Sequence, residues 1–199
     1  MRKVSKEFLI KFEENIKKIY ENGKIKAPIH LSGNNEDSLI KIFKRINKKD
    51  WVFSTWRNHY HALLHGIDGK WLHKEIVSGR SMGIINKKKN FFSSAIVGGI
   101  LPISLGVALS IKKHKKKQKV WVFIGDMTFE TGVFHETYKY AKNFNLPIHF
   151  IIEDNGLSTN TPTKNAWGKR SKIKKNKYIS YYKYKRNFPH HGTGSWILF

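Results

Sequence analysis

Two stretches decide the fold of this chain: VFIGDM at residues 122–127 and IIEDNGL at residues 151–157. Each is a β-prone apolar run that ends in small or polar residues, and Pro147 leads into the second run. A helical pattern lies between the two runs, and its predicted inner side consists of Val133, Phe134, Thr137, Tyr138, Ala141 and Phe144. A strand, a helix and a strand within about 30 residues form a βαβ unit, so the sequence predicts an α/β fold with a parallel, covered sheet.

Outside this unit, the pattern predicts two N-terminal helices and a further strand. Residues 5–22 have one apolar face, with Ser5 as the N-cap and Gly23 as the stop. Residues 36–46 form a second helix that begins with two acids, and residues 51–55 form a short β-prone run. Residues 91–111 carry no charge and are long enough to span a bilayer, but several Ser, Gly and Pro residues interrupt them. A buried helix that packs closely through its glycines is therefore preferred over a transmembrane helix.

The composition limits the class of protein. With 199 residues the chain is long enough for a single domain, predicted as N-terminal helices (1–50), a core (51–163) and a basic, aromatic tail (164–199). The absence of cysteine excludes disulfides, thiolate metal sites and cysteine nucleophiles. The first seven residues lead into the first helix without the apolar core of a signal peptide, which predicts a cytoplasmic protein.

The formal net charge of +24 suggests a polyanionic partner. However, only six of the 38 basic residues are arginine, the residue that binds phosphate in a bidentate manner. Residues 169–186 interleave basic residues with four tyrosines, a composition that can bind single-stranded nucleic acid. We prefer to interpret this segment as solvated and loosely ordered, with its tyrosines anchoring it to the body. A basic nucleic-acid-binding protein is kept as an alternative.

Polar residues follow both strands of the βαβ unit, at the edge where open α/β sheets bind ligands. Asp126 offers a carboxylate and Asn155 a carbonyl oxygen, the hard ligands that Mg²⁺ combines with phosphate oxygens and water. The helix that begins after Asp126 directs its N-terminal amides to the same place, and Gly125 lets the backbone approach a ligand closely. The residues therefore predict a Mg²⁺–diphosphate site, although an N-cap and an Asn-Gly turn are the simpler alternative.

This motif, Gly125-Asp126 followed 29 positions after the aspartate by Asn155, resembles the cofactor motif of thiamine diphosphate enzymes. The closer resemblance is to the alpha subunit of the two-chain 2-oxo acid dehydrogenase first component, the decarboxylating component of those complexes. It extends from about residue 19 to about residue 163. Further blocks that carry it are residues 19–25 (IYENGKI), 30–36 (HLSGNNE), 55–59 (TWRNH), 79–83 (GRSMG) and 95–102 (AIVGGILP).

The resemblance implies a thiamine diphosphate-binding fold, with an open, mostly parallel sheet and helices on both faces. It implies that Mg²⁺ is bound by the side chains of Asp126 and Asn155 and by the backbone carbonyl of Leu157. It implies that Arg57 pairs with the diphosphate and that His59 is an active-site histidine. The other cofactor-binding residues that it implies are Ala95, Ile96 and Val97, whose backbone contacts the aminopyrimidine ring, and Gly125 and Met127 beside the diphosphate.

The implied activity is decarboxylation of a small 2-oxo acid, with transfer of the product to a lipoyl acceptor protein where one exists. The resemblance implies that a beta-type partner subunit supplies the glutamate that activates the cofactor, in a heterotetramer. We expect neither a specific nucleic acid nor a membrane as a partner. The chain departs from the family pattern at Trp56, Met127 and Asp154, and residues 169–199 show no counterpart of the family's second diphosphate-binding arginine or its further histidine. A catalytically inactive cofactor-binding or assembly subunit is therefore the alternative.

His59, His61 and His65 lie close together in the sequence, which raises the alternative of a zinc site. Without cysteine or a nearby pair of carboxylates, this alternative is weaker than the Arg-x-His motif as an explanation of His59. We expect His61 and His65 to be packing or surface residues.

Overall fold

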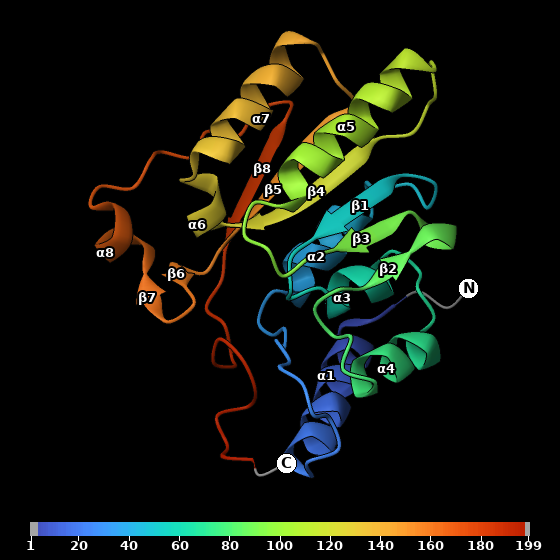
Figure 1. Ribbon diagram of the computed structural model, residues 1–199, viewed down its shortest axis with the longest axis vertical. Coiled ribbons are helices and arrows are strands. Elements are labelled where there is room, and N and C mark those ends of the chain that lie inside the picture. Colours follow the sequence, from blue (N-terminus) through green and yellow to red (C-terminus); the bar gives the residue numbers. More distant parts are fainter. Residues whose placement is uncertain (1–3, 198–199) are drawn as a thin grey trace.

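The computed structural model describes residues 4–197 (Figure 1). Its centre is a six-stranded sheet of order β2-β3-β1-β4-β5-β8, in which only the β2–β3 pair is antiparallel. These strands are β1 (Trp51–Ser54), β2 (Ile85–Asn86), β3 (Phe91–Ser93), β4 (Val120–Gly125), β5 (Ile148–Asp154) and β8 (Ile179–Lys183). A separate two-stranded ribbon pairs β6 (Leu157–Ser158) with β7 (Thr161–Pro162). The predicted mostly parallel sheet is confirmed.

Helices cover both faces of the sheet (Figure 1). One face packs against α1 (Lys6–Glu21), α2 (Glu36–Phe43), α3 (His59–Leu64) and α4 (Gly69–Val77). The other packs against α5 (Ile100–Lys113) and α7 (Gly132–Asn143), with the single turn α6 (Asp126–Phe129) directly after β4. The strands alternate accordingly, since Phe123 belongs to the first core and Val122 and Ile124 belong to the second. The remaining elements are η1 (Lys87–Lys89) and α8 (Thr163–Trp167).

The predicted βαβ unit is confirmed, with a correction to its helix. β4 and β5 are parallel neighbours, in a register that places Gly125 beside Glu153. The helix predicted to begin after Asp126 is divided into α6 and α7, so the helix at this sheet edge is only four residues long. On α7, Phe134, Thr137 and Ala141 are buried as predicted. Phe144 is 50% exposed, because it lies at the C-cap and stacks on Tyr140 at the surface.

The uncharged segment 91–111 forms β3, a turn and the first part of α5. Within residues 4–197, no helix is both long and apolar enough to cross a membrane. The prediction that the helix packs through its glycines is wrong, because Gly106 is exposed and a Cβ there would meet nothing within 4 Å. The close approach occurs before the helix, at Gly98, where φ is +75° and a Cβ would lie 2.8 Å from a methyl of Val133.

The basic, aromatic segment 169–186 is more ordered than predicted. Its residues Ile179–Lys183 form β8, which pairs along β5, so the prediction of a loosely ordered segment is wrong for this part. The physical reason lies in two tyrosines, since the hydroxyl of Tyr181 donates to Asp154 and that of Tyr182 donates to Glu153. The predicted anchoring by tyrosine is confirmed. After β8 the chain runs back past the sheet edge to the loop that holds His30 (Figure 1). Residues 1–3 and 198–199 of the predicted single domain lie outside the described residues.

Candidate functional site

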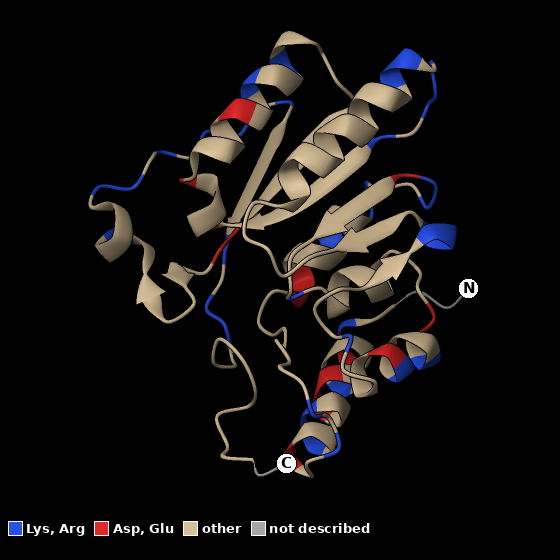
Figure 2. Ribbon diagram, viewed as in Figure 1, with Lys and Arg blue, Asp and Glu red and all other residues tan. Residues whose placement is uncertain are grey.

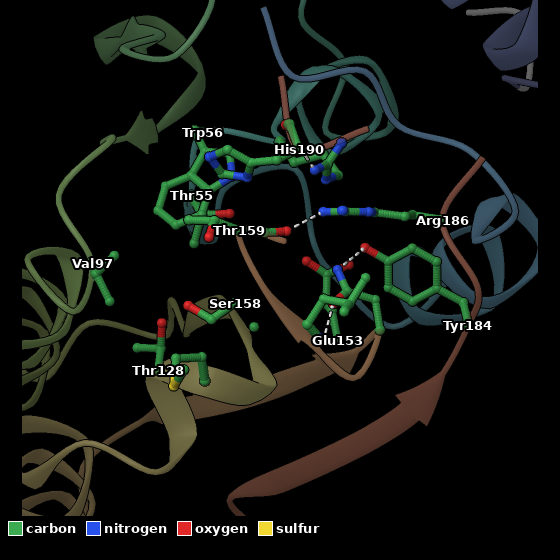
Figure 3. A pocket seen from close by; sticks show the side chains of 15 residues that line it. Thr55, Trp56, Val97, Thr128, Glu153, Ser158, Thr159, Tyr184, Arg186 and His190 are labelled. Carbon is green, nitrogen blue, oxygen red and sulfur yellow. Dashed lines mark hydrogen bonds between the residues drawn. The ribbon is translucent and has the colours of Figure 1, made fainter. Parts of the chain in front are cut away.

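A solvent-open pocket of about 600 Å³ lies at the carboxyl ends of β1, β4 and β5. Its walls come from the ends of β1, β4 and β5, the β6 strand and the segment after β8, with Val97 on the side opposite Tyr184 and Arg186 (Figure 3). The lining residues of the three strand ends and β6 are Thr55, Trp56, Arg57, Gly125, Met127, Thr128, Glu153, Asn155, Leu157, Ser158 and Thr159. This is the edge at which open α/β sheets bind ligands. The predicted site residues that line the pocket are Arg57, Val97, Gly125, Met127, Asn155 and Leu157. His59, Ala95, Ile96 and Asp126 are not among the lining residues.

Gly125 leaves space in the pocket that any other residue would fill. Its φ is −76° and its ψ is 164°, a backbone conformation that every residue can adopt. A Cβ at this position would meet nothing within 4 Å. The backbone therefore does not require glycine, and the missing side chain leaves room for a ligand against the end of β4.

Asp126 is fully buried directly behind this part of the pocket. Its Oδ2 accepts a hydrogen bond of 2.6 Å from the Thr163 hydroxyl and lies 3.2 Å from the guanidinium of Arg170. Its Oδ1 is buried and has no hydrogen-bond partner among the described residues. Burial raises the pKa of Asp126, since a carboxylate loses its hydration there. A buried carboxylate oxygen without a hydrogen-bond partner is able to serve as a cation ligand.

Arg170 compensates the acidic departure from the family pattern at Asp154. Its guanidinium lies 3.0 Å from Asp154 Oδ2, so it connects the carboxylates at the ends of β4 and β5. Asp154 also accepts hydrogen bonds from the Tyr181 hydroxyl at 2.7 Å and from the Gly156 amide at 2.9 Å. Burial acts to raise the pKa of Asp154, but the hydrogen bonds from Tyr181 and Arg170 outweigh it and hold the pKa below its ordinary value. The additional negative charge is thus neutralised by the protein itself.

Asn155 and Leu157 form a tight turn at the pocket wall. The Asn155 side-chain carbonyl accepts a hydrogen bond of 2.9 Å from the Leu157 amide, and its amide donates to the Tyr184 hydroxyl at 3.4 Å. This turn fixes the orientation of the side chain. A carbonyl oxygen has two lone pairs, so the oxygen of Asn155 retains one acceptor position.

Arg57 is a buried cation that lines the pocket. Its guanidinium donates to the backbone carbonyl of Leu31 and, at 3.3 Å, to that of His190. The carbonyl of His190 also accepts a 2.6 Å hydrogen bond from Nδ1 of His30. These contacts fix Arg57 and connect it to the returning C-terminal segment, and no carboxylate forms an ion pair with it within residues 4–197.

His30 provides a test of this connection through pH. Burial lowers its pKa from 6.5 to about 3, so between these values the folded protein binds fewer protons than the unfolded chain. The contribution of neutral His30 to the free energy of unfolding is therefore fully present above pH 6.5. It decreases as the pH falls toward 3, by up to about 1.4 kcal/mol per pH unit. Between pH 7 and pH 5, we expect wild type to lose about 1–2 kcal/mol more than His30→Gln in urea unfolding. An equal loss of unfolding free energy in both proteins would contradict the lowered pKa of His30. The control is His114→Gln, because His114 is exposed.

His59 lies away from the pocket. Its ring is fully buried, with Nδ1 3.0 Å from the Glu13 carboxylate and Nε2 2.9 Å from the Ser81 hydroxyl. Glu13 also accepts a hydrogen bond of 2.9 Å from the Ser32 amide. Both ring nitrogens are therefore occupied in connecting α3 to α1 and to the loop at residue 81. The structure does not bring His59 to the residues that line the pocket.

The loop at residues 95–97 reaches the pocket only through Val97. Ile96 is 72% exposed and Val97 is 51% exposed, so two apolar side chains face solvent at the rim of the site. Single exposed apolar residues are common on protein surfaces, but two adjacent ones beside a pocket suit contact with a ligand or another subunit.

The sequence did not indicate Glu153, Tyr184, Arg186 or His190, all of which line the pocket. Glu153 is held by the Tyr182 hydroxyl and by Nε2 of His61 at 3.2 Å. Its position at the end of β5, inside the stretch that decides the fold, was an available signal. The other three belong to a segment whose return to the sheet edge is a tertiary feature.

His61 and His65 are buried packing residues, as expected. The ring of His61 is bound between Ser54 and Glu153, and burial lowers the pKa of His65. In the described part of the chain, no three His, Asp or Glu side chains are grouped so that they could hold a metal ion. A Mg²⁺ site here therefore depends on Asp126 together with amide and carbonyl oxygens.

Comparison with known proteins gives the family. The family model described as "Dehydrogenase E1 component" matches residues 5–181. The chain belongs to this family. This E1-family chain is 31% identical over 160 residues to the alpha subunit of acetoin:2,6-dichlorophenolindophenol oxidoreductase from Cupriavidus necator, covering 75% of this chain and 48% of the relative. It is 30% identical over 164 residues to the pyruvate dehydrogenase E1 component subunit alpha of Rickettsia prowazekii, covering 77% and 50%.

The E1-family chain spans about half the length of the curated relatives that it matches. The resemblance to the alpha-subunit family is confirmed, and so is the predicted fold class, because this family has the thiamine diphosphate-binding fold. The family typically uses thiamine diphosphate and Mg²⁺.

Proposed function

We propose that this E1-family chain is an alpha-type subunit that binds the diphosphate end of thiamine diphosphate together with Mg²⁺, for decarboxylation of a small 2-oxo acid. The observation that carries the proposal is a pair of adjacent residues at the end of β4, Gly125 and Asp126. Gly125 leaves open space in the pocket, and the next residue is a buried aspartate with an unpartnered oxygen. The accessible backbone at Gly125 suits a diphosphate, and the unpartnered carboxylate oxygen of Asp126 suits a cation. These two residues therefore fit thiamine diphosphate with Mg²⁺, which the family uses.

Different residues of the chain would bind the metal ion, the diphosphate and the aminopyrimidine ring of the cofactor. Asp126 Oδ1, the side-chain carbonyl of Asn155 and the backbone carbonyl of Leu157 would hold Mg²⁺, while Thr163 and Arg170 hold Asp126 Oδ2 and so leave Oδ1 for the cation. Arg57 would neutralise the diphosphate, and Met127 would contact it beside Gly125. Ala95, Ile96 and Val97 would contact the aminopyrimidine ring at the rim. When bound, the cofactor supplies the electron sink for loss of CO₂, and the protein supplies binding, orientation and charge.

His59 acts in this account as a positioning residue. It binds Glu13 on α1 and Ser81, and it follows Arg57 by two residues, so it fixes the start of α3 beside the pocket. The side-chain amide of Asn58 also donates a hydrogen bond of 2.9 Å to the backbone carbonyl of Ser81, which connects the same two segments a second time. Together these bonds hold the segment that carries Arg57 in one orientation.

A beta-type subunit completes the proposed site. The relatives are alpha subunits by name, and a subunit so named acts beside another. Exposed Ile96 and Val97 at the rim are apolar surface that such a partner would cover. The heterotetramer, the lipoyl acceptor and the cytoplasmic location belong to the same proposal.

The position of His59 favours a second candidate, a cofactor-binding or assembly subunit without turnover. If His59 is the active-site histidine that the resemblance implies, its burial between Glu13 and Ser81 removes it from the reacting groups. The two candidates differ in one measurement, since only the first predicts CO₂ release from a 2-oxo acid when a beta-type subunit is present. A nucleic-acid role has less support, because Lys and Arg are spread over α1, α4, η1 and the ends of α5 and α7 (Figure 2).

Gly125→Val tests the proposed function. Its backbone conformation suits valine and no atom obstructs the side chain, so we expect an unchanged unfolding temperature without ligand. Wild type should gain about 5–10 °C when thiamine diphosphate with MgCl₂ is present at about 100 times its Kd, and Gly125→Val should gain almost nothing. Gly83→Val is the matched control, because Gly83 is exposed, has equally open surroundings and lies outside the pocket. Equal stabilisation of all three proteins would refute the proposal.

A further inference from the structure

A second hollowed surface lies at the amino ends of the parallel strands, the edge of the sheet opposite the pocket. It consists of two neighbouring solvent-open hollows, of about 690 Å³ and about 620 Å³, which share Arg45 and Lys119 and form one amino-edge groove. In its lining, Lys49 precedes β1, Lys119 precedes β4 and Lys177 precedes β8. Because these strands are parallel, the loops that lead into them meet at one edge.

The amino-edge groove is strongly basic. Its cationic side chains are all at exposed positions, and they are Arg45, Lys49, Lys117, Lys119 and Lys177. Within residues 4–197, none of these five forms an ion pair with a carboxylate. Figure 2 shows the connection from α5 to β4, which contributes two of them, largely in blue. The positive charge of this edge is therefore available to a partner.

The carboxylate in the lining of the groove, Asp50, does not balance these cations. Asp50 is buried, and its Oδ1 accepts a hydrogen bond of 2.9 Å from the Lys119 amide. Its Oδ2 accepts from the Asn47 amide at 3.0 Å and from Nε1 of Trp121 at 2.9 Å. Both oxygens thus connect the loops that lead into β1 and β4, and neither contacts a side-chain cation of the groove.

The buried ring of His149 is affected by the same positive charge. Its Nδ1 lies 3.0 Å from the Lys177 carbonyl and its Nε2 lies 2.8 Å from the Ser180 hydroxyl. Burial lowers the pKa of His149, the hydrogen bond with Lys177 opposes this change, and the charges of Arg45 and Lys119 lower the pKa further. The cations of the groove therefore act on their surroundings without a compensating anion.

The aromatic rings of the groove are covered by its cations. The guanidinium of Arg45 lies 5.5 Å from the ring centroid of Trp121, and Nζ of Lys177 lies 4.9 Å from that of Tyr178. Trp121 is 4% exposed and Tyr178 is 6% exposed, so neither ring offers a free face on which a base could stack. The groove thus presents charges without a stacking platform, which favours carboxylates over the bases and phosphates of a single-stranded nucleic acid.

We propose that the amino-edge groove binds an acidic peptide segment of a partner protein, with the peptide carboxylates paired to the five cations. The cations are distributed over two adjoining hollows, an arrangement that suits an extended chain with several charges better than one compact ion. Four of the five are lysines, whose flexible point charges adapt to carboxylates at varied positions. The groove and the pocket lie at opposite edges of the sheet, so this inference does not depend on the proposed function.

Fluorescence anisotropy of labelled decaglutamate with the full chain, at about 0.15 M salt, tests the inference. We expect saturable binding that weakens about 10-fold when Arg45→Gln and Lys119→Gln are combined, because two ionic contacts are lost. Lys119→Gln alone should weaken binding about threefold. The changed side chains are exposed, so we expect unfolding temperatures close to that of wild type without the peptide.

The matched control combines Lys70→Gln with Lys74→Gln, which removes two charges from exposed positions on α4, outside the groove. It should bind decaglutamate within about twofold of wild type. Equal weakening by both double variants would mean that only the net charge of the chain matters and would overturn the proposal, as would no binding by wild type. Decathymidylate that displaces decaglutamate and binds more tightly would assign the groove to nucleic acid and would also overturn it.

Discussion

Asp126→Asn is expected to reduce the affinity for thiamine diphosphate with Mg²⁺ by at least about 100-fold. The substitution removes the only formal negative charge of the proposed Mg²⁺ ligand set, which otherwise consists of the neutral oxygens of Asn155 and Leu157. The asparagine retains an acceptor for Thr163, and Arg170 retains Asp154 as its partner. Without ligand, we therefore expect a change in unfolding free energy of only about 1 kcal/mol.

The matched control for this experiment is Asp154→Asn. It replaces the neighbouring carboxylate at the end of β5, which is bound to Arg170 and Tyr181 and is not a proposed ligand. Affinity for the cofactor should remain within a few-fold of wild type, because the substitution restores the residue type of the family pattern. The account would be contradicted if the two variants lost Mg²⁺-dependent binding equally, since the site would then require both charges rather than the Oδ1 atom of Asp126.

Glu13→Ala is expected to lower the free energy of unfolding by about 3–5 kcal/mol, equivalent to a fall of about 6–20 °C in Tm for a chain of this size. The carboxylate of Glu13 is buried and accepts from the Ser32 amide and from Nδ1 of His59. Removing it leaves two buried donors without an acceptor, in addition to a cavity under α1. Glu13→Gln retains one acceptor and should lose less.

Glu14→Ala is the control for the buried pair. Glu14 lies on the same helix at an exposed position, and its removal should change the unfolding free energy by at most about 0.5 kcal/mol. A destabilisation by Glu13→Ala as small as that of Glu14→Ala would show that the Glu13–His59 contact does not connect α1 to the pocket segment. The positioning role of His59 would then have no support.

The parts of the fold that the sequence could predict are those with strong local patterns. β4 and β5 are near-continuous apolar runs, and all seven residues of β5 are buried, so their pairing could be inferred from the run lengths and the helix between them. β8 has no such run. Its order comes from pairing with β5 and from two tyrosine hydroxyls bound to residues 27 and 29 positions away in the chain.

The pocket shows the same division between local and tertiary information. Gly125 and Asn155 could be located because the carboxyl ends of neighbouring parallel strands meet at one edge. His59 could not be located in this way, because α3 begins at that residue and the turn directs its ring toward Glu13 rather than toward the pocket. Arg186 and His190 reach the site only because the segment after β8 returns to the pocket. The sequence around them contains no periodic pattern that would predict this return.

The central claim is that this E1-family chain carries a Mg²⁺–diphosphate half-site at the end of β4. Isothermal titration of the purified chain with thiamine diphosphate, with and without MgCl₂, and with thiamine in place of thiamine diphosphate, tests the claim most directly. The account predicts saturable one-to-one binding of thiamine diphosphate that requires Mg²⁺, with no binding of thiamine, which lacks the diphosphate. Binding of thiamine diphosphate that is equally tight without Mg²⁺, or no binding under either condition, would contradict it.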